Sequence, residues 1–208
     1  MAQRTALCTA STSRTIRQMD GRCGAEVRAT TVDNLLIREW RNFQIGIIII
    51  GEEGRMQVLL LSMPDSFEHM PTVGIRMPNG ALSSIAGNVD SHHKVAVADL
   101  ILVQDRVRQI VSDLVADLRP EVVGLSAMTF QRKTAKKLIR LIRDLAPDTK
   151  IVAGGYDPSL AADAYTAEDG ADFVIRGEGE SAFRELLRAL EDSNDFPAIR
   201  LTATSGRQ

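Results

Sequence analysis

The sequence has few cysteines, little net charge and no long apolar run. Its two cysteines, Cys8 and Cys23, have no metal-binding spacing and make no disulfide framework, so a reducing cytoplasm is the expected location. The longest apolar stretch, "IGIIII" (45–50), is far shorter than the ~18 residues of a membrane span. A formal net charge of −2 offers no polyanion-binding surface. We therefore expect neither a membrane nor a nucleic-acid partner.

Catalytic motifs are also missing. The sequence contains no nucleophile elbow and no metal-ligand cluster, and its three histidines are His69, His92 and His93. The pair His92–His93 lies in the polar stretch "DSHHK", where we expect solvated side chains. His69 lies in a loop and is either a ligand or base, or a side chain with a structural hydrogen bond. Acid–base catalysis is therefore hard to build from this chain alone.

The N-terminal part differs from the rest in composition. Residues 1–32 are rich in Ser, Thr and Arg and show no periodicity, which predicts a disordered extension; a transit peptide has a similar composition. Met56 immediately precedes a strong strand pattern, so we assign residues 1–55 to an N-terminal extension, largely disordered, with an added strand near 44–50. A hairpin across 43–62, with Gly-Glu-Glu-Gly as the turn, is the alternative.

From Met56 onward, short apolar runs alternate with helical periodicity. The predicted strands cover 57–62, 94–100, 121–127, 149–155 and 171–177. The predicted helices cover 80–89, 104–118, 131–146, 158–168 and 180–191. This alternation predicts an α/β fold: a flavodoxin-like, doubly wound, five-stranded parallel sheet of order 2-1-3-4-5 in a three-layer α/β/α sandwich. The domain spans 56–191, and 192–208 form a C-terminal tail.

The two central helices have clear inward faces. The inward positions are Val107, Ile110, Val111, Leu114, Val115 and Leu118 in the first, and Ala135, Leu138, Ile139, Ile142 and Leu145 in the second. The outer face of the second helix is basic, with Arg132, Lys133, Lys136, Lys137, Arg140 and Arg143. This basic face is either a solvated surface or a docking face for another domain.

Ligands of doubly wound sheets bind at the carboxyl ends of the strands, so four loops are candidates. "GEGESA" (177–182) fits the dinucleotide fingerprint G-x-G-x-x-G/A formally, but it follows the last strand, and its two carboxylates would repel a pyrophosphate. A phosphoacceptor receiver needs a lysine after the fifth strand, and a flavodoxin needs a Ser/Thr-Gly nest after the first. Both are missing here. A large neutral ligand, held by backbone, glycines and small hydroxyls, is the remaining interpretation.

Four segments in order carry a family resemblance. They are "VLLLSMPD" (58–65), "DLRPEVVGLSAMT" (117–129), "IVAGGYDPS" (151–159) and "DFVIRGEGESAFRELLRAL" (172–190). With them, residues 56–191 resemble the cobalamin (B12)-binding N-terminal domain of B12-dependent radical SAM proteins. The resemblance implies a domain that cradles the corrinoid and its nucleotide tail at the strand ends.

The resemblance also implies which residues bind the cofactor. They are Pro64, Asp65, Ser66, His69 and Thr72 after the first strand; Ser126, Ala127, Met128 and Thr129 after the third; Gly154, Gly155 and Tyr156 after the fourth; and Gly177, Glu178 and Gly179 after the fifth. By this resemblance the hydroxyl of Ser126 hydrogen-bonds the cofactor, and the tail passes close to Gly154 and Gly155. Glu178 and Glu180 either cap the last helix or contact a further domain.

Two departures from the family pattern qualify the function. Methionine-synthase-like domains carry Asp-x-His-x-x-Gly after the first strand, and "PDSFEHMPTVG" (64–74) has a different spacing, so we expect His-off binding, with His69 as a cobalt ligand the alternative. The Cys-x-x-x-Cys-x-x-Cys segment that holds a [4Fe-4S] cluster is not present, so S-adenosylmethionine and the cluster belong to a domain of the relatives.

Two hypotheses follow. The first is the cobalamin-binding module of a radical SAM-type system of the methyltransferase or cyclase kind, either truncated or a stand-alone carrier that meets a radical SAM domain or partner chain. The second is a non-enzymatic, flavodoxin-like interaction or regulatory module without corrinoid, with the basic face as its partner surface. Whether the chain itself is an enzyme stays open.

Overall fold

We describe the fold from a computed structural model of the 208-residue chain. The described residues are 28–32, 35–40, 45–51, 54–64, 80–101, 106–166 and 170–192, with the first two strands and residues 45–47 described by their backbone course. The predicted loop residues 65–79 and the C-terminal tail from 193 lie outside these ranges.

A parallel five-stranded sheet forms the centre of the domain. Its strands in chain order are β4 (Gln57–Ser62), β5 (Lys94–Asp99), β6 (Val122–Ser126), β7 (Lys150–Gly154) and β8 (Phe173–Val174). Their spatial order is β5-β4-β6-β7-β8, and each neighbouring pair is parallel. This is the predicted order 2-1-3-4-5, and the prediction is confirmed. The chain reverses direction along the sheet between β5 and β6, which lie on opposite sides of β4.

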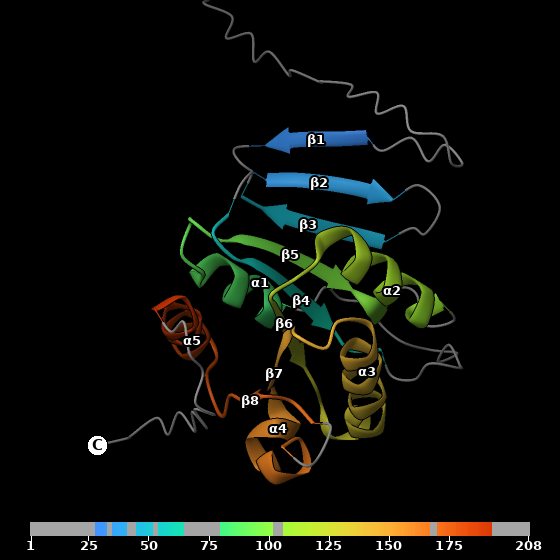
Figure 1. Ribbon diagram of the computed structural model, residues 1–208, viewed down its shortest axis with the longest axis vertical. Coiled ribbons are helices and arrows are strands. Elements are labelled where there is room, and N and C mark those ends of the chain that lie inside the picture. Colours follow the sequence, from blue (N-terminus) through green and yellow to red (C-terminus); the bar gives the residue numbers. More distant parts are fainter. Residues whose placement is uncertain are drawn as a thin grey trace, which may run out of the picture.

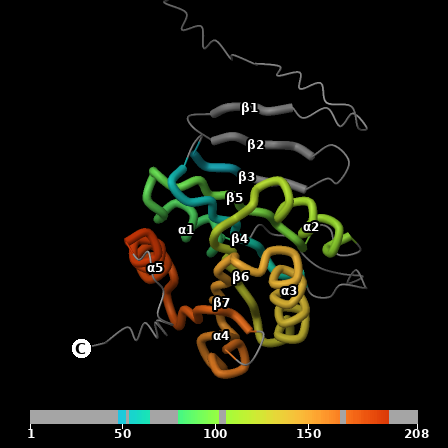
Figure 2. The backbone as a smooth tube through the Cα atoms, in the orientation of Figure 1, coloured from blue at the N-terminus to red at the C-terminus, as the bar shows by residue number. Residues whose placement is uncertain are grey.

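Helices cover both faces of the sheet. In Figure 1, α1 (Gly80–Asn88) and α5 (Glu180–Asp192) lie on one side, and α2 (Val107–Leu118) and α3 (Arg132–Leu145) lie on the other. The short helix α4 (Tyr156–Leu160) follows β7 at the far edge. The doubly wound course of the chain can be followed from α1 to α5 in Figure 2. The predicted three-layer α/β/α sandwich is therefore present.

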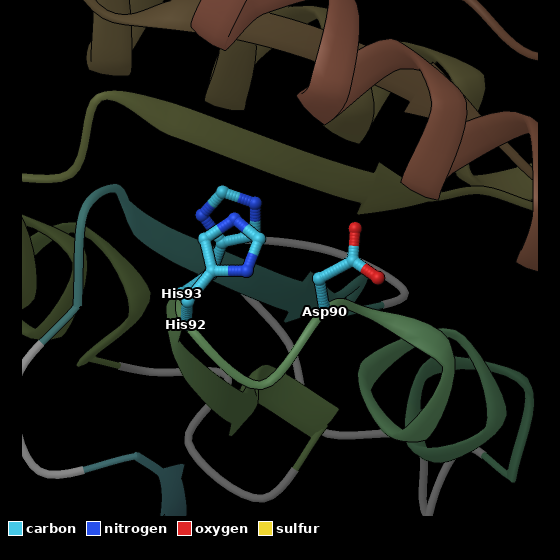
Figure 3. A group of neighbouring side chains, drawn as sticks. All are labelled: Asp90, His92 and His93. Atoms are coloured by element: carbon cyan, nitrogen blue, oxygen red, sulfur yellow. The ribbon is translucent and has the colours of Figure 1, made fainter.

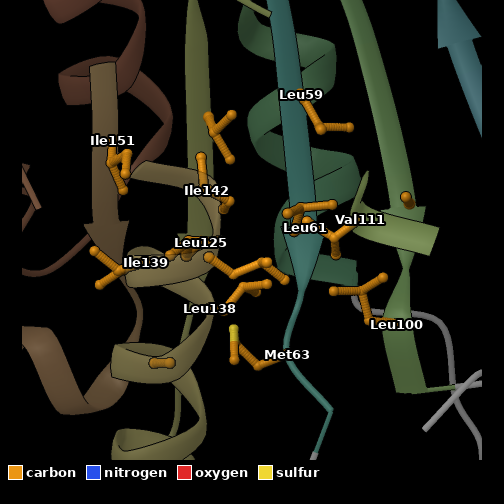
Figure 4. Packing of buried hydrophobic residues seen from close by; sticks show 14 of the residues in the cluster. Leu59, Leu61, Met63, Leu100, Val111, Leu125, Leu138, Ile139, Ile142 and Ile151 are labelled. Atoms are coloured by element: carbon orange, nitrogen blue, oxygen red, sulfur yellow. The ribbon is translucent and has the colours of Figure 1, made fainter. Parts of the chain in front are cut away.

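The core has two apolar clusters, one on each side of the sheet. The cluster under α2 and α3 includes Leu59, Leu61 and Ile142, all fully buried, and Figure 4 shows how closely these side chains approach one another. The cluster under α1 and α5 includes Leu60 and Phe183. Alternate residues of β4 therefore serve opposite clusters, which explains why its sequence is a continuous apolar run.

Three further strands extend the sheet beyond β5. They are β1 (Arg28–Val32), β2 (Leu35–Trp40) and β3 (Ile45–Ile50), and they are paired antiparallel in this order, with β3 beside β5. The added strand expected near 44–50 is present as β3, whereas β1 and β2 were not expected. The alternative hairpin across 43–62 is wrong, because β5 lies between β3 and β4 and pairs with both.

Several element boundaries differ from the prediction. The last strand is only two residues long, because the chain leaves the sheet after Ile175 and turns at Gly177, which has a φ of 80°. The helix predicted over 158–168 is replaced by α4 and a single 3₁₀ turn, Ala162–Ala164. Leu145, predicted to face inward, is 41% exposed in the last turn of α3.

Among the described residues, no helix combines the length and apolarity that a membrane crossing requires.

Candidate functional site

A cavity of about 220 Å³ lies between the sheet and the helices α1 and α5, and it includes the carboxyl ends of β6 and β7. Ser126 and Gly154, the last residues of these two strands, are paired in register and both line it. The sheet also contributes Val152, α1 contributes Ile85, and α5 contributes Phe183. The walls are therefore mostly apolar, and the hydroxyl of Ser126 is one of few polar groups within them.

Gly154 keeps the floor of the cavity open. A Cβ added at this position would have no heavy atom closer than 3.9 Å. The space beside its backbone belongs to the cavity rather than to a packed side chain. A ligand can therefore approach this backbone closely, as the sequence predicts for Gly154.

Gly155 joins the loops that follow β6 and β7. Its φ is 98°, and a Cβ here would lie 2.9 Å from the Ser126 hydroxyl and from the backbone N and O of Ala127. The Ala127 amide donates to the Gly154 carbonyl at 2.9 Å, and the Asp157 amide donates to the Ala127 carbonyl at 3.0 Å. Only glycine fits this position without strain, because both the backbone angle and the space exclude a side chain.

A buried carboxylate ties α3 to α4 beside these loops. The Asp157 side chain accepts two hydrogen bonds from Arg132, at 2.8 Å and 2.6 Å, and one from the Tyr165 hydroxyl at 2.6 Å. The Arg132 hydrogen bonds, partly opposed by burial and assisted by Tyr165, lower the pKa of Asp157 to about 2. Burial raises the pKa of Tyr165, so its hydroxyl keeps its proton and donates. We call these three side chains the Asp157 clamp.

The loop after β8 closes the cavity toward α1. The Gly177 amide donates to the Ser159 hydroxyl at 3.0 Å, and the Ser84 hydroxyl of α1 donates to the Glu180 carboxylate at 2.9 Å. The backbone amide of Glu180 itself, and then Ser84, lower the pKa of this carboxyl group. Glu180 is the first residue of α5, so its charge lies where the helix dipole favours it, as predicted.

Large apolar side chains are exposed on the loops that follow β6 and β7. They are Met128 (47% exposed), Phe130 (68%), Tyr156 (59%) and Leu160 (67%), and we call them the apolar rim. Met128 and Phe130 follow β6, and Tyr156 and Leu160 are the first and last residues of α4, so all four come after the strand ends that line the cavity. The sequence prediction included Met128 and Tyr156 and missed Phe130 and Leu160.

The structure brings together many of the predicted site residues. The cavity is lined by Ser126, Gly154, Gly155, Gly177, Glu178 and Gly179. Ala127, Met128, Thr129 and Tyr156 lie on the adjoining loops and outside the cavity lining, and Pro64 is buried just after β4. Asp65, Ser66, His69 and Thr72 lie outside the described residues.

The prediction missed the helical walls of the cavity and one histidine. Ile85 and Phe183 were assigned to helices without a role in binding, because periodicity identifies an inward face but not what that face contacts. The prediction that His92 and His93 are both solvated is wrong for His93, which is 1% exposed. It precedes β5 directly, and the end of α5 covers it, a contact that local polarity does not predict.

The fold and the cavity define a flavodoxin-like domain with a binding site at the carboxyl ends of its parallel strands. The family model described as the B12 binding domain matches residues 67–187. The chain belongs to this family. The expected resemblance is therefore confirmed.

Similar proteins include enzymes that are much longer than this chain. An anaerobic magnesium-protoporphyrin IX monomethyl ester cyclase of Synechocystis is 31% identical over 153 residues, which cover 69% of this chain and 30% of the cyclase. The cobalamin-dependent radical SAM methyltransferase TokK of Streptomyces tokunonensis is 32% identical over 84 residues, 39% of this chain and 12% of TokK.

A solved structure supports the fold. The radical S-adenosylmethionine methyltransferase TsrM of Kitasatospora setae, solved with tryptophan and an S-adenosylmethionine analogue, matches with a TM-score of 0.54 and 22% identity, over 67% of this chain and 26% of TsrM. The chain thus spans less than a third of the length of each of these three proteins.

Proposed function

We propose that this chain binds cobalamin and places the nucleotide tail of the cofactor in the cavity between α1, α5 and the sheet. The main support for this proposal is the cavity at the carboxyl ends of β6 and β7, in a chain that belongs to the B12-binding family. Its volume of about 220 Å³ is below the roughly 300–1,000 Å³ of a site that encloses a drug-sized ligand. It therefore suits one arm of a large cofactor, with the corrin ring outside.

The apolar residues of the cavity fit the aromatic base at the end of the nucleotide tail. Ile85, Val152 and Phe183 exclude water from its sides, and the open backbone at Gly154 allows close approach. The Ser126 hydroxyl offers a hydrogen bond at the inner end. Glu178 and Glu180 also line the cavity, so the anionic phosphodiester of the tail has to lie away from these two carboxylates. The apolar rim then provides a surface for the corrin ring.

The cofactor supplies a reactive cobalt centre that carries a methyl group or electrons. The described residues offer no general acid, base or nucleophile in the cavity apart from the two rim carboxylates and the Ser126 hydroxyl. The chain's own contribution is thus binding, orientation and exclusion of water. We propose that it serves a radical SAM-type enzyme of the methyltransferase or cyclase kind, whose catalytic part is a further domain or a partner chain.

We further propose that the cobalt is not ligated by a histidine of this chain. The support is the spacing of "PDSFEHMPTVG", which differs from the Asp-x-His-x-x-Gly of His-on domains. In the alternative, His-on binding, His69 would be the cobalt ligand.

Both proposals are tested in one experiment. Full-length protein is mixed with hydroxocobalamin and desalted, and the absorption spectrum of the retained cofactor is recorded for wild type and His69→Ala. We expect retained cofactor with the same cobalt bands in both proteins. A shift of the bands in His69→Ala would contradict His-off binding. Protein that is folded by circular dichroism but retains no cofactor would overturn the proposed function and favour the interaction module.

A further inference from the structure

A second group of functional side chains lies at the opposite end of the sheet, where the strands begin. Asp90, His92 and His93 belong to the turn between α1 and β5, and Glu191 lies in the last turn of α5. Figure 3 shows the three side chains of the turn projecting from the same short segment, and α5 passes over them. The rings of His92 and His93 have their centroids 4.2 Å apart.

His93 is buried without a polar partner. Its side chain is 0% exposed, and neither ring nitrogen has a hydrogen-bond partner among the described residues. Glu191 Oε1 lies 3.8 Å from His93 Nδ1, and this oxygen is buried without a hydrogen bond as well. Burying polar atoms without partners is costly, and native structures rarely leave them so. A metal ion that binds both groups would remove this cost.

The geometry suits a metal ion between these groups. His92 Nε2 lies 3.2 Å from Glu191 Oε2, and one ligand atom each of Asp90, His92 and His93 lies within 4.8 Å of the others. Ligand atoms around a tetrahedral zinc ion, with bonds of about 2.0–2.1 Å, are roughly 3.4 Å apart. The observed separations need shifts of an ångström or so to meet this spacing.

The neighbouring charges decide which side chains are free to ligate. The Asp90 carboxylate accepts hydrogen bonds from Arg188 Nε and Nη2 at 2.7 Å and 2.8 Å, so it is already engaged. Arg55 Nε lies 3.6 Å from Glu191 Oε1 and does not hydrogen-bond it. The two arginines balance the two carboxylates, and the histidines add neutral nitrogen ligands.

We propose that His92, His93 and Glu191 bind a divalent transition-metal ion, with zinc as the best match. Two imidazoles and one carboxylate form a ligand set that suits zinc, and a water molecule on the exposed side of His92 would complete four ligands. The ion would fasten the turn before β5 to the end of α5. The site is separate from the cofactor cavity, since α5 enters the cavity at Glu180 and reaches the metal ligands at Glu191.

The test uses ring-nitrogen signals of the full-length chain. The sequence has three histidines, so a long-range ¹H–¹⁵N spectrum resolves three rings, assigned with His69→Ala and His92→Ala. Cys8 and Cys23 are replaced by serine to remove competing thiols, and the protein is free of corrinoid. We expect one equivalent of Zn²⁺ to shift the ring nitrogens of His92 and His93 and to leave those of His69 unchanged. Unshifted His92 and His93 signals would overturn the proposal, whatever the variants do.

Calorimetric titration with Zn²⁺ gives the affinity and the ligand set. We expect a stoichiometry of one, and a loss of at least about tenfold in affinity in His92→Ala and in Glu191→Gln. His69→Ala is the matched histidine control, and Glu185→Gln, at an exposed position of the same helix, is the matched acidic control. Both should bind as the parent protein does. Wild-type affinity in His92→Ala or Glu191→Gln, or equal losses in the two controls, would contradict the assignment.

Discussion

Asp157 connects the loops beside the cavity through a single buried carboxylate. It receives hydrogen bonds from Arg132 at the start of α3 and from Tyr165, which follows α4. Its own backbone amide holds the loop after β6 through the Ala127 carbonyl. The Asp157 clamp therefore fixes two loops whose geometry the cavity depends on, although the carboxylate itself does not line the cavity. It acts as a positioning group.

Replacing the Asp157 carboxylate by an amide should destabilise the domain. Asp157→Asn keeps the shape but leaves the Arg132 guanidinium without its buried partner, so we expect the free energy of unfolding at pH 7 to fall by about 2 kcal/mol. Urea unfolding measures it. Asp163→Asn, an exposed acid on the following 3₁₀ turn, is the matched control and should change stability by less than about 0.5 kcal/mol. Equal effects of the two substitutions would contradict the clamp.

The same substitution should change how stability depends on pH. The pKa of Asp157 is about 2 in the folded protein, against 3.8 for an unperturbed aspartate, so its stabilisation is complete above pH ~4 and lost as the pH falls through about 2. We expect the wild-type free energy of unfolding to decrease across this window more steeply than that of Asp157→Asn. Parallel curves for the two proteins would show that the carboxylate is not stabilised by the fold.

The positions of single residues could be predicted from the sequence where the order of strands in the sheet determines them. Ser126 and Gly154 end adjacent parallel strands, so their meeting at the cavity follows from the topology. Prediction failed at His93, because burial there results from α5, which is about a hundred residues away in the sequence. The Asp157 clamp was not foreseen either, since its hydrogen bonds need the relative placement of α3 and α4.

At the level of elements, α5 contributes to both the site and the core. Its first residue, Glu180, lines the cavity and bonds to α1 through Ser84. One turn later Phe183 is 2% exposed and packs between the cavity and the sheet, where a Cβ added at Gly124 would come within 3.5 Å of it. The helix therefore both completes the core on this face and forms a wall of the cavity.

Substitutions of one buried and one exposed phenylalanine distinguish core packing from the surface of the apolar rim. Phe183→Ala should lower the free energy of unfolding by about 3 kcal/mol, because it leaves a cavity in a packed face. Phe130→Ala, which removes an exposed ring of the apolar rim, should change it by less than about 0.5 kcal/mol and should weaken hydroxocobalamin binding. Urea unfolding and cofactor titration of the two variants measure this. A stability loss in Phe130→Ala equal to that in Phe183→Ala would contradict the description of the rim.

Element-level prediction was most successful for buried parallel strands and amphipathic helices. β4 reads as a strand because both of its faces are covered, and α2 because one stripe is apolar. It was least successful where tertiary pairing decides: β8 is short because the chain turns at Gly177, and β1 and β2 have short, mixed sequences with no strict alternation. β2 pairs with β3 and β1 pairs with β2, and this pairing, rather than local pattern, places the two strands in the sheet.

In the whole molecule, the fold brings glycine-rich loops and two helices together at the carboxyl ends of the parallel strands. The family match covers residues 67–187, and this range includes most of the residues that line the cavity. The chain covers 30% of the Synechocystis cyclase and 12% of TokK, so the chemistry of such enzymes needs more than this domain. The proposed metal site lies at the opposite end of the parallel strands, away from the proposed cofactor cavity.

The most direct test of the account is an equilibrium titration of the full-length protein with hydroxocobalamin, comparing wild type with Gly154→Val. A Cβ at this position has no heavy atom closer than 3.9 Å, and Gly154 lines the cavity, so we expect the valine side chain to occupy part of the proposed tail cavity. Gly87→Val, at an exposed position of α1 with no atom within 4 Å, is the matched control. We predict one bound equivalent in wild type and control, and affinity at least about tenfold lower, or 1.4 kcal/mol, in folded Gly154→Val. No binding by folded wild-type protein, or wild-type affinity in Gly154→Val, would contradict the account.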